Sequence, residues 1–213
     1  MKDLNPQLAR IFRIVHISNV PWILDHGGLH CQNSADLDPN YVNIGNVSLI
    51  DKRARRYVPV PPGGPLSDYV PFYFTPFSIM MYNVKTGYGG ISRRDNKDIV
   101  IFVSSVHRLE ELSVPFVFTN QHAYAVDTEF YDDLQHLDKI DWPLLQSRDF
   151  KTDDNDPGKQ LRYQAEALIH MRVPLNAVLG IACVNDAVKH NLDALLEQHG
   201  IKFAVRSKPT WYF

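Results

Sequence analysis

Alternating and continuous apolar runs along the chain predict a series of short β-strands. Residues 9–17, "ARIFRIVHI", place β-branched and aromatic residues on alternate faces, and residues 98–106, "DIVIFVSSV", form the clearest buried strand. Comparable runs fill residues 114–120, 179–184 and 202–213. No internal repeat or low-complexity tract interrupts the series.

Helical periodicity is confined to a few segments. Residues 18–28 predict a short helix that Ser18 or Asn19 can cap and that the Gly27-Gly28 pair stops. Residues 185–200 predict an amphipathic helix that ends at a glycine. The expected apolar face of this second helix consists of Val188, Leu192, Leu195 and Leu196.

Other segments carry weaker signals. From Leu29 to about Arg56 there is little periodicity, which predicts a long ordered loop of the kind that is usually functional. Residues 68–84 are strand-like on either side of their prolines, residues 86–90 predict a hairpin turn, and a helix is expected around residues 129–137. Because strands and helices mix without regular βαβ alternation, the chain predicts a mainly antiparallel α+β fold.

One carboxylate, Glu166, interrupts the apolar run "LRYQAEALIHMRVPL". If a helix capped by Asp156 continued through this run, Glu166 would face solvent with Arg162 and His170 as its ion-pair neighbours. If instead a strand began near Ala165, alternation would turn the carboxylate toward one face of a sheet. The pattern alone does not separate these two interpretations.

The composition is that of an ordinary globular protein. Its 213 residues, 45% apolar and 22% charged, predict a single domain spanning residues 1–213. A net charge of −2 excludes a generally basic character, and the local basic runs at residues 52–56 and 93–94 would ordinarily be solvated. Cys31 and Cys183 lack metal-like spacing and predict free buried thiols. With no apolar run of roughly 20 residues and no signal peptide, we expect a cytoplasmic protein without a membrane partner.

Common catalytic motifs are missing from the sequence. "GYGG" does not sit at a strand-to-helix junction, so it is no phosphate loop, and no nucleophile elbow marks a serine enzyme. Glycines separate His26 from His30, so no metal site is expected. What remains is a dispersed polar set, each member of which has an ordinary structural explanation when taken alone. The set comprises His16, Ser18, Asn19, Arg53, His122 and Glu166.

Several pieces of the chain, taken in order, resemble the DarT toxins, NAD-dependent ADP-ribosyltransferases that modify single-stranded DNA. The pieces are "RIVHISNVPWILDHGGLHC", "NIGNVSLIDKRARRYVPV", "DYVPFYFTPFSIMMYNV", "VPFVFTNQHAY", "RYQAEALIHMRVP" and the terminal "WYF". Together they span nearly the whole chain, and their order and spacing are specific to the family. The Met80-Met81 pair stands where the family more often has "PM".

The resemblance implies a fold and a set of site residues. The fold is that of the ADP-ribosyltransferase superfamily: a split, mostly antiparallel sheet with flanking helices and an NAD cleft between its halves. The segment from about Asp36 to Arg53 would fold over NAD, and the segment from about Thr119 to Glu166 would recognise the substrate. The implied NAD contacts are His16, Ile17, Ser18, Asn19, Asn33 and Arg53. The implied nucleic-acid contacts are His122, Tyr124 and Met80, and the implied catalytic residues are Glu166 and Arg53.

The implied chemistry suits these residue types. Cleavage of the nicotinamide–ribose bond develops positive charge on the ribose, and a carboxylate that accepts a hydrogen bond from a ribose hydroxyl stabilises that charge. The family arginine has been proposed to assist proton removal from the base. Since arginine is effectively always protonated, Arg53 is expected to stabilise charge, and a literal general base would need another group or water. NAD is then a co-substrate, and no metal is required.

By resemblance, the chain is expected to be a toxin that attaches ADP-ribose to a base in a short single-stranded DNA motif, with thymine as the favoured base. A macrodomain antitoxin is implied by family association only. Aromatic residues near the expected cleft could stack on bases, although core packing is the ordinary explanation for Phe72 and Phe74. The alternatives are the same fold acting on guanine, RNA or protein, and a catalytically silent nucleic-acid-binding module.

Overall fold

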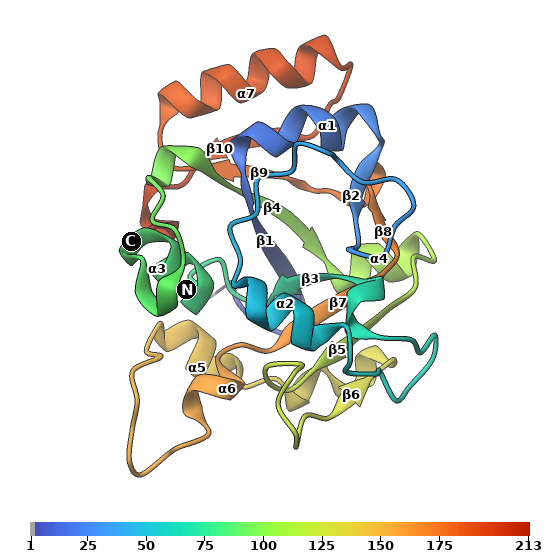
Figure 1. The fold of residues 1–213 in the computed structure, drawn as a ribbon, viewed down its shortest axis with the longest axis vertical. Helices are drawn as coiled ribbons and strands as arrows, with labels where there is room; N and C mark the ends of the chain where they lie inside the picture. The colour runs from blue at the N-terminus through green and yellow to red at the C-terminus, as the bar shows by residue number, and fades with distance from the viewer. Residues whose placement is uncertain (1–2) are drawn as a thin grey trace.

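An eight-stranded sheet runs through the centre of the molecule (Figure 1). The computed structural model describes residues 3–213. The strand order is β10-β9-β4-β1-β3-β7-β5-β6, and β2 and β8 form a separate two-stranded sheet. The strands are β1 Arg10–His16, β2 Gly28–His30, β3 Tyr69–Tyr73, β4 Ile99–Ser105, β5 Phe116–Thr119, β6 Phe130–Tyr131, β7 Glu166–His170, β8 Arg172–Pro174, β9 Gly180–Cys183 and β10 Ala204–Ser207.

The large sheet consists of two halves that meet at β1 and β3. β1 pairs with β4, and β3 with β7, along their whole lengths. Between the halves, the register joins β1 to β3 at one position, Phe12 opposite Tyr73. All pairings in this sheet are antiparallel except that of β9 with β10. The expected split, mostly antiparallel α+β fold is therefore confirmed.

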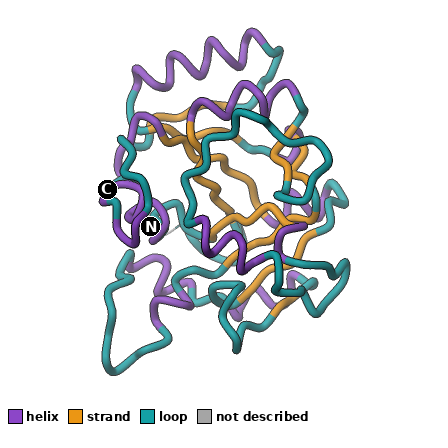
Figure 2. The backbone as a smooth tube through the Cα atoms, in the orientation of Figure 1, coloured by secondary structure: helices purple, strands orange, loops and turns teal. Residues whose placement is uncertain are grey.

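Short helices and long connections surround the sheet (Figure 2). The α-helices are α1 Val20–Asp25, α2 Val47–Arg53, α3 Ile79–Thr86, α4 Val106–Glu111, α5 Trp142–Ser147, α6 Lys159–Arg162 and α7 Asp186–Gln198. The 3-10 helices are Ile17–Asn19, Leu66–Asp68, Tyr88–Gly90, Asn96–Asp98, Leu134–Lys139, Leu175–Ala177 and Pro209–Trp211. Among residues 3–213, no helix is long and apolar enough to cross a membrane.

The strongest helical prediction, α7, is confirmed. The Asn185 side chain accepts a hydrogen bond from the Val188 N–H and so caps the helix. Val188, Leu192 and Leu196 are buried. The helix connects β9 to β10, which explains why these two strands are parallel.

The prediction for the second half of residues 68–84 is wrong. β3 ends at Tyr73, and the chain then forms α3, whose start is capped by the Ser78 hydroxyl accepting from the Met81 N–H. Met81 and Val84 are buried at helical spacing. The local cap outweighs the β-propensity of the aromatic run. The turn at residues 86–90 ends this helix through Gly87 (φ 77°), so it is not a hairpin turn.

Three further expectations need correction. The segment around residues 129–137 forms β6 and a 3-10 helix, and no α-helix. The loop expected from Leu29 to about Arg56 begins within β2 and contains α2. Asp156 does not cap α6, because its carboxylate is engaged by the Arg162 guanidinium at 2.6 and 3.0 Å.

Two apolar clusters hold the fold. The larger one packs both halves of the sheet against α1, α3, α4 and α7, and includes the free, buried thiols of Cys31 and Cys183 and both Phe72 and Phe74, as expected. The smaller cluster is built from residues of β3, β5, β6 and β7 and of the segments next to them. It consists of Val58, Leu66, Tyr69, Val117, Ala123, Phe130 and Leu168.

Candidate active site

Glu166 is the first residue of β7 and is only 1% exposed. α6 ends at Arg162, so the strand interpretation of the run "LRYQAEALIH" is confirmed. The alternative surface ion pair is wrong, because the Arg162 guanidinium binds Asp156 and Asp141 instead. The carboxylate is thus buried in the sheet, where an unpaired charge would cost several kcal/mol.

Two groups from distant parts of the chain compensate for this burial. The Arg53 Nη1 donates to Glu166 Oε2 at 3.0 Å and to Oε1 at 3.2 Å. The Ala123 N–H donates to Oε1 at 3.0 Å. The Glu166 backbone is also fixed, since its N–H donates to the Thr119 hydroxyl at 3.1 Å. The carboxylate is therefore held in one orientation.

Arg53 reaches Glu166 from the last turn of α2. Asn46 caps this helix by accepting from the Leu49 N–H, which explains why the otherwise aperiodic segment becomes helical here. The Arg53 side chain is 12% exposed. Its Nη2 is buried and has no hydrogen-bond partner among residues 3–213. A buried, unpartnered guanidinium nitrogen beside a cavity indicates a place for a ligand acceptor atom.

His122 lies next to the same carboxylate, with its Nδ1 3.9 Å from Glu166 Oε1. Nδ1 accepts from the Tyr124 N–H at 3.2 Å, so the proton of the neutral ring is on Nε2. Burial lowers the pKa of His122 and outweighs the opposing effect of the nearby Glu166 charge. The ring is therefore a neutral hydrogen-bonding group at neutral pH.

Tyr73 stands opposite Glu166 in the β3–β7 register. Burial, followed by the negative charge of Glu166, raises the pKa of its phenol. Tyr73 is thus a neutral phenol on the cavity wall.

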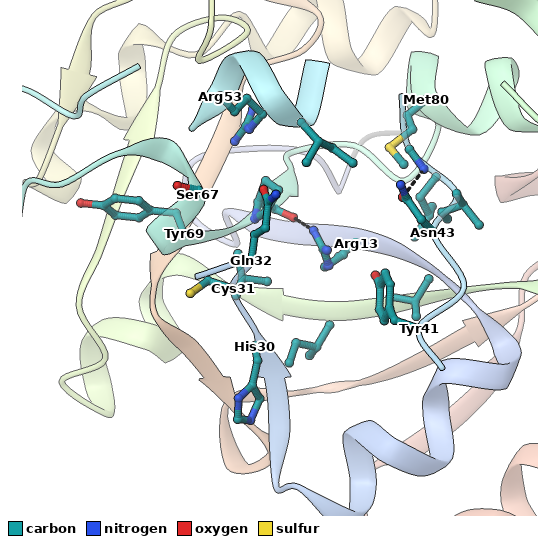
Figure 3. Close-up of a pocket in the computed structure, with 18 of the residues that line it drawn as sticks. Arg13, His30, Cys31, Gln32, Tyr41, Asn43, Arg53, Ser67, Tyr69 and Met80 are labelled. Carbon is teal, nitrogen blue, oxygen red and sulfur yellow. Dashed lines mark hydrogen bonds between the residues drawn. The ribbon is translucent and has the colours of Figure 1, made fainter. Parts of the chain in front are cut away.

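A cavity of about 400 Å³ lies where the two halves of the sheet part. Its wall combines residues of β1 and β3 with α2 and with the segment that precedes α2. Figure 3 shows Arg13, from β1, and Arg53, from α2, on this wall, with Tyr41 and Asn43 of the connecting segment at its side. The volume falls within the range of about 300–1,000 Å³ that is usual for small-molecule sites.

Four of the residues implied by the resemblance line this cavity: Arg53, Met80, His122 and Glu166. Tyr124 lies outside the wall, two residues after His122, and is 38% exposed. The structure thus brings the implied catalytic pair together with two of the three implied nucleic-acid contacts.

The implied NAD contacts other than Arg53 lie just beyond the wall. His16, Ile17, Ser18 and Asn19 follow Val15, which lines the cavity, and Asn33 follows Gln32, which also does. The Asn19 amide donates to the Val42 carbonyl at 3.0 Å and accepts from its N–H at 2.9 Å. Asn19 thus occupies the N-cap position of α1, as the sequence allowed, but its side chain does not bond to the helix and instead ties the segment before α2 to the end of β1.

His16 and Asn33 have local partners as well. His16 Nδ1 lies 2.7 Å from the Ser18 hydroxyl, and burial, followed by the charge of Arg94, lowers the pKa of this histidine. The Asn33 amide donates to Ser67 and Asp68. Its partner Ser67 is itself part of the cavity wall.

Sequence reasoning missed Arg13. Its Nη1 donates to the Pro71 carbonyl at 2.8 Å and so bridges β1 and β3 across the split. The signal was present, because a cation in the middle of "ARIFRIVHI" is as anomalous as the carboxylate in the run around Glu166. His26 and His30 pack against Trp22. Within residues 3–213, no group of three His, Cys, Asp or Glu side chains is placed to hold a metal ion.

Comparison with known proteins adds an identity to this geometry. A family model described as "ssDNA thymidine ADP-ribosyltransferase, DarT" matches residues 12–213. A DNA ADP-ribosyl transferase of Escherichia coli O127:H6 (strain E2348/69 / EPEC) is 52% identical over 211 residues, covering 99% of this chain and 96% of the relative. A protein of the same description from Thermus sp. (strain 2.9) is 31% identical over the full length of both chains.

Solved structures give the same picture of the fold. The Thermus sp. 2.9 DarT in complex with ADP-ribosylated ssDNA superposes with a TM-score of 0.90 at 29% identity, covering 98% of each chain. The same Thermus protein in complex with NAD+ gives a TM-score of 0.85 at 28% identity, covering 98% of this chain and 99% of the other.

Proposed function

This chain belongs to the DarT family and is an NAD-dependent DNA ADP-ribosyltransferase, and on that premise we propose that it modifies thymine in a short single-stranded DNA motif and acts as a toxin. The observation that carries the site assignment is the Arg53–Glu166 ion pair on the wall of the cavity. It joins two segments 113 residues apart at the place where the sheet opens.

Glu166 is the proposed catalytic carboxylate. A carboxylate offers about four lone-pair sites. Its Oε1 accepts from Arg53 and Ala123, whereas Oε2 accepts only from Arg53 among residues 3–213. Oε2 therefore has room to accept a ribose hydroxyl, orient the sugar and stabilise the positive charge that develops as nicotinamide leaves.

Arg53 is the proposed charge stabiliser. A guanidinium has no lone pair to offer as a base, so Arg53 cannot remove a proton from the thymine ring. Its free Nη2 can donate either to a phosphate oxygen of NAD or to the base as negative charge develops on it. We infer that the proton of the ring nitrogen leaves to water or to a neutral acceptor nearby.

NAD is the co-substrate and supplies ADP-ribose with nicotinamide as the leaving group. Several features support its binding in the cavity: the suitable volume, the unpartnered Arg53 Nη2, and a covering segment tied down by Asn19. His16, Ile17, Ser18 and Asn33 are proposed as further contacts, either direct or through the neighbouring wall residues.

The DNA side of the proposal rests on His122, Tyr124 and Met80. His122 and Met80 line the cavity, and Tyr124, two residues after His122, is exposed. A double helix hides the Watson–Crick edge of the base, which explains a requirement for single strands. Because the net charge is −2, affinity for DNA in general should be weak, and a few contacted nucleotides should determine recognition.

The biological role follows from the family. We propose that residues 1–213 form one ADP-ribosyltransferase domain whose activity is toxic and is countered by a macrodomain antitoxin. The antitoxin is supported by the family resemblance alone. The cytoplasmic location stays a prediction from the sequence.

The decisive experiment uses labelled NAD with three substrates: a thymine-only single strand, a guanine-only single strand, and the thymine strand annealed to its complement. Label is expected on the first alone, and Glu166→Ala should abolish it. Glu197→Ala on α7 is the matched control, because that carboxylate is exposed and far from the cavity.

Each alternative gives a different result. Label on the guanine strand alone contradicts the choice of base. An active Glu166→Ala variant contradicts the catalytic assignment. If neither protein consumes NAD with any strand, the chain is not the enzyme proposed here.

A further inference from the structure

Arg53 sits on a helix that packing alone does not hold in place. α2 buries none of its residues, and Val47 at its start is 63% exposed. The position of the Arg53 guanidinium relative to Glu166 therefore depends on how the chain is held on both sides of α2: by the Asn19 hydrogen bonds to Val42 before the helix, and by the contacts that follow the helix.

After the helix, the chain is held in place by Arg56. Its carbonyl accepts from the Leu66 N–H at 2.8 Å, which ties the end of the helix to the following turn. Its Nη2 donates to the carbonyls of Ala125 and Val126 at 3.3 and 3.4 Å. The guanidinium carbon lies 6.0 Å from the centre of the Phe130 ring. One half-buried side chain thus connects the Arg53 segment to residues 121–128, which we call the 121–128 loop.

The 121–128 loop carries the other group that orients Glu166. The Ala123 N–H in this loop donates to Glu166 Oε1, and His122 lies beside the same oxygen. His122 lies on the side of this loop that faces the cavity, and Val126, which is 92% exposed, lies on its outer side. A connection between Arg56 and this loop therefore sets the distance between the Arg53 guanidinium and the Ala123 N–H, which both donate to the Glu166 carboxylate.

We propose that Arg56 is a positioning residue: it locks the 121–128 loop to the end of α2, so that Arg53 and the Ala123 N–H converge on Glu166. The catalytic part of this inference rests on the proposed function. The charge of Arg56 supports this role, because the carbonyls of Ala125 and Val126 each accept a charge-assisted hydrogen bond from its guanidinium. The buried Nε of Arg56 has no hydrogen-bond partner among residues 3–213, and burying such a group costs free energy of folding. A long apolar side chain would avoid this cost, so the presence of arginine favours a role for the hydrogen bonds of its guanidinium.

The competing explanation is the smaller apolar cluster. Val58, Leu66, Ala123 and Phe130 also join the two segments, and could hold the loop without Arg56. The two explanations differ in what happens when the guanidinium is removed and the apolar cluster is left intact.

The test compares Arg56→Gln with Arg55→Gln, which removes a neighbouring exposed cation from the same basic run. Amide hydrogen exchange of the peptide covering residues 121–128 should become about tenfold faster in Arg56→Gln, equivalent to about 1.4 kcal/mol of local stability. Arg55→Gln should leave it unchanged. Arg56→Lys keeps the charge but loses the planar fork, so its exchange rate should lie between those of the parent and of Arg56→Gln. This variant also serves as the test if Arg56→Gln does not fold.

Activity supplies the second readout. Arg56→Gln should lower kcat for DNA modification about tenfold, leave KM for NAD within about threefold, and divert a larger share of consumed NAD to hydrolysis. A general loss of folded protein would not change that partition. Unchanged exchange in the 121–128 loop overturns the proposal whatever the activity, and faster exchange with normal kcat and partition overturns the catalytic part. If the parent enzyme modifies no strand, the proposed function fails, while the exchange result still decides whether Arg56 holds the loop.

Discussion

Replacement of Glu166 by glutamine should separate catalysis from stability. The substitution keeps the size of the side chain and removes its charge. The amide oxygen can still accept from the Ala123 N–H, but its NH2 group then faces the Arg53 guanidinium, donor against donor. Arg53 loses its only anionic partner among the side chains of residues 3–213 and keeps a 12% exposed guanidinium.

Two magnitudes follow from this geometry. For the reaction, loss of one preorganised charge-stabilising group commonly costs about 2.7–4 kcal/mol, or roughly two to three decades in kcat. For stability, three hydrogen bonds to an anion become fewer and weaker and Arg53 loses its counter-charge, while the cost of burying the anion disappears. The net loss should be about 2 kcal/mol, within the range of about 1.5–3 kcal/mol for a hydrogen bond to a charged group, and this shifts Tm by roughly 4–8 °C for a domain of this size.

The assay is steady-state kinetics with a thymine-containing single strand, together with thermal unfolding of the same samples. kcat should fall at least about a hundredfold with KM for NAD little changed, because the lost interaction acts mainly in the transition state. Glu197→Gln serves as the control and should match the parent in both measurements. A Glu166→Gln enzyme within a few-fold of the parent kcat would refute the role assigned to the carboxylate, and an equal rise in KM would show that Glu166 acts in ground-state binding.

Three more predictions concern neighbouring groups. Arg53→Lys keeps the charge but should lower kcat about ten- to a hundredfold, since hydrogen bonds to charged groups are worth about 1.5–3 kcal/mol; near-normal turnover would make Arg53 an ordinary surface cation. Asn19→Ala removes both hydrogen bonds to Val42 and should raise KM for NAD several-fold with kcat retained, and an unchanged KM would mean that the segment before α2 is held elsewhere. Burial lowers the pKa of His122, so the unfolded chain binds this proton more readily. The stability due to the neutral ring is complete above about pH 6.5 and is lost as pH falls through the lower pKa of the folded state. The free energy of unfolding in urea should therefore decline less between pH 8 and pH 5 in His122→Gln than in the parent. If the two proteins show the same pH dependence, the lowered pKa of His122 is contradicted.

Sequence patterns predicted those elements whose local signals agree with their final environment. β1, β4, β5, β9 and α7 were all expected, because apolar periodicity and capping point to the same structure in each. α3 was missed because an aromatic, strand-like composition competed with a serine cap that only the structure shows in use. The segment around α2 was missed because its side chains face the cavity and solvent, so no apolar periodicity marks the helix.

The site also contains features that the sequence indicates and others that only the structure shows. The anomaly at Glu166 is visible in the sequence, as is the one at Arg13, because each places a charge in an apolar strand. What the sequence could not supply is the partner: Arg53 and Ala123 lie 113 and 43 residues from Glu166, and only the closed sheet brings them to one carboxylate. The family resemblance supplied the pairing of Arg53 with Glu166 as site residues, but it did not indicate that the two side chains bind one another.

This direct contact constrains the reaction. If Glu166 and Arg53 act as proposed, their existing pairing means that little rearrangement is needed: the anion would face the sugar that gains positive charge, and the cation would face the base that gains negative charge. Each also neutralises the other in the resting protein, which makes both charges tolerable at 1% and 12% exposure. The same arrangement motivates the proposed anchoring by Arg56: a cation on a helix without buried residues can serve both oxygens of the carboxylate when the end of that helix is held in place.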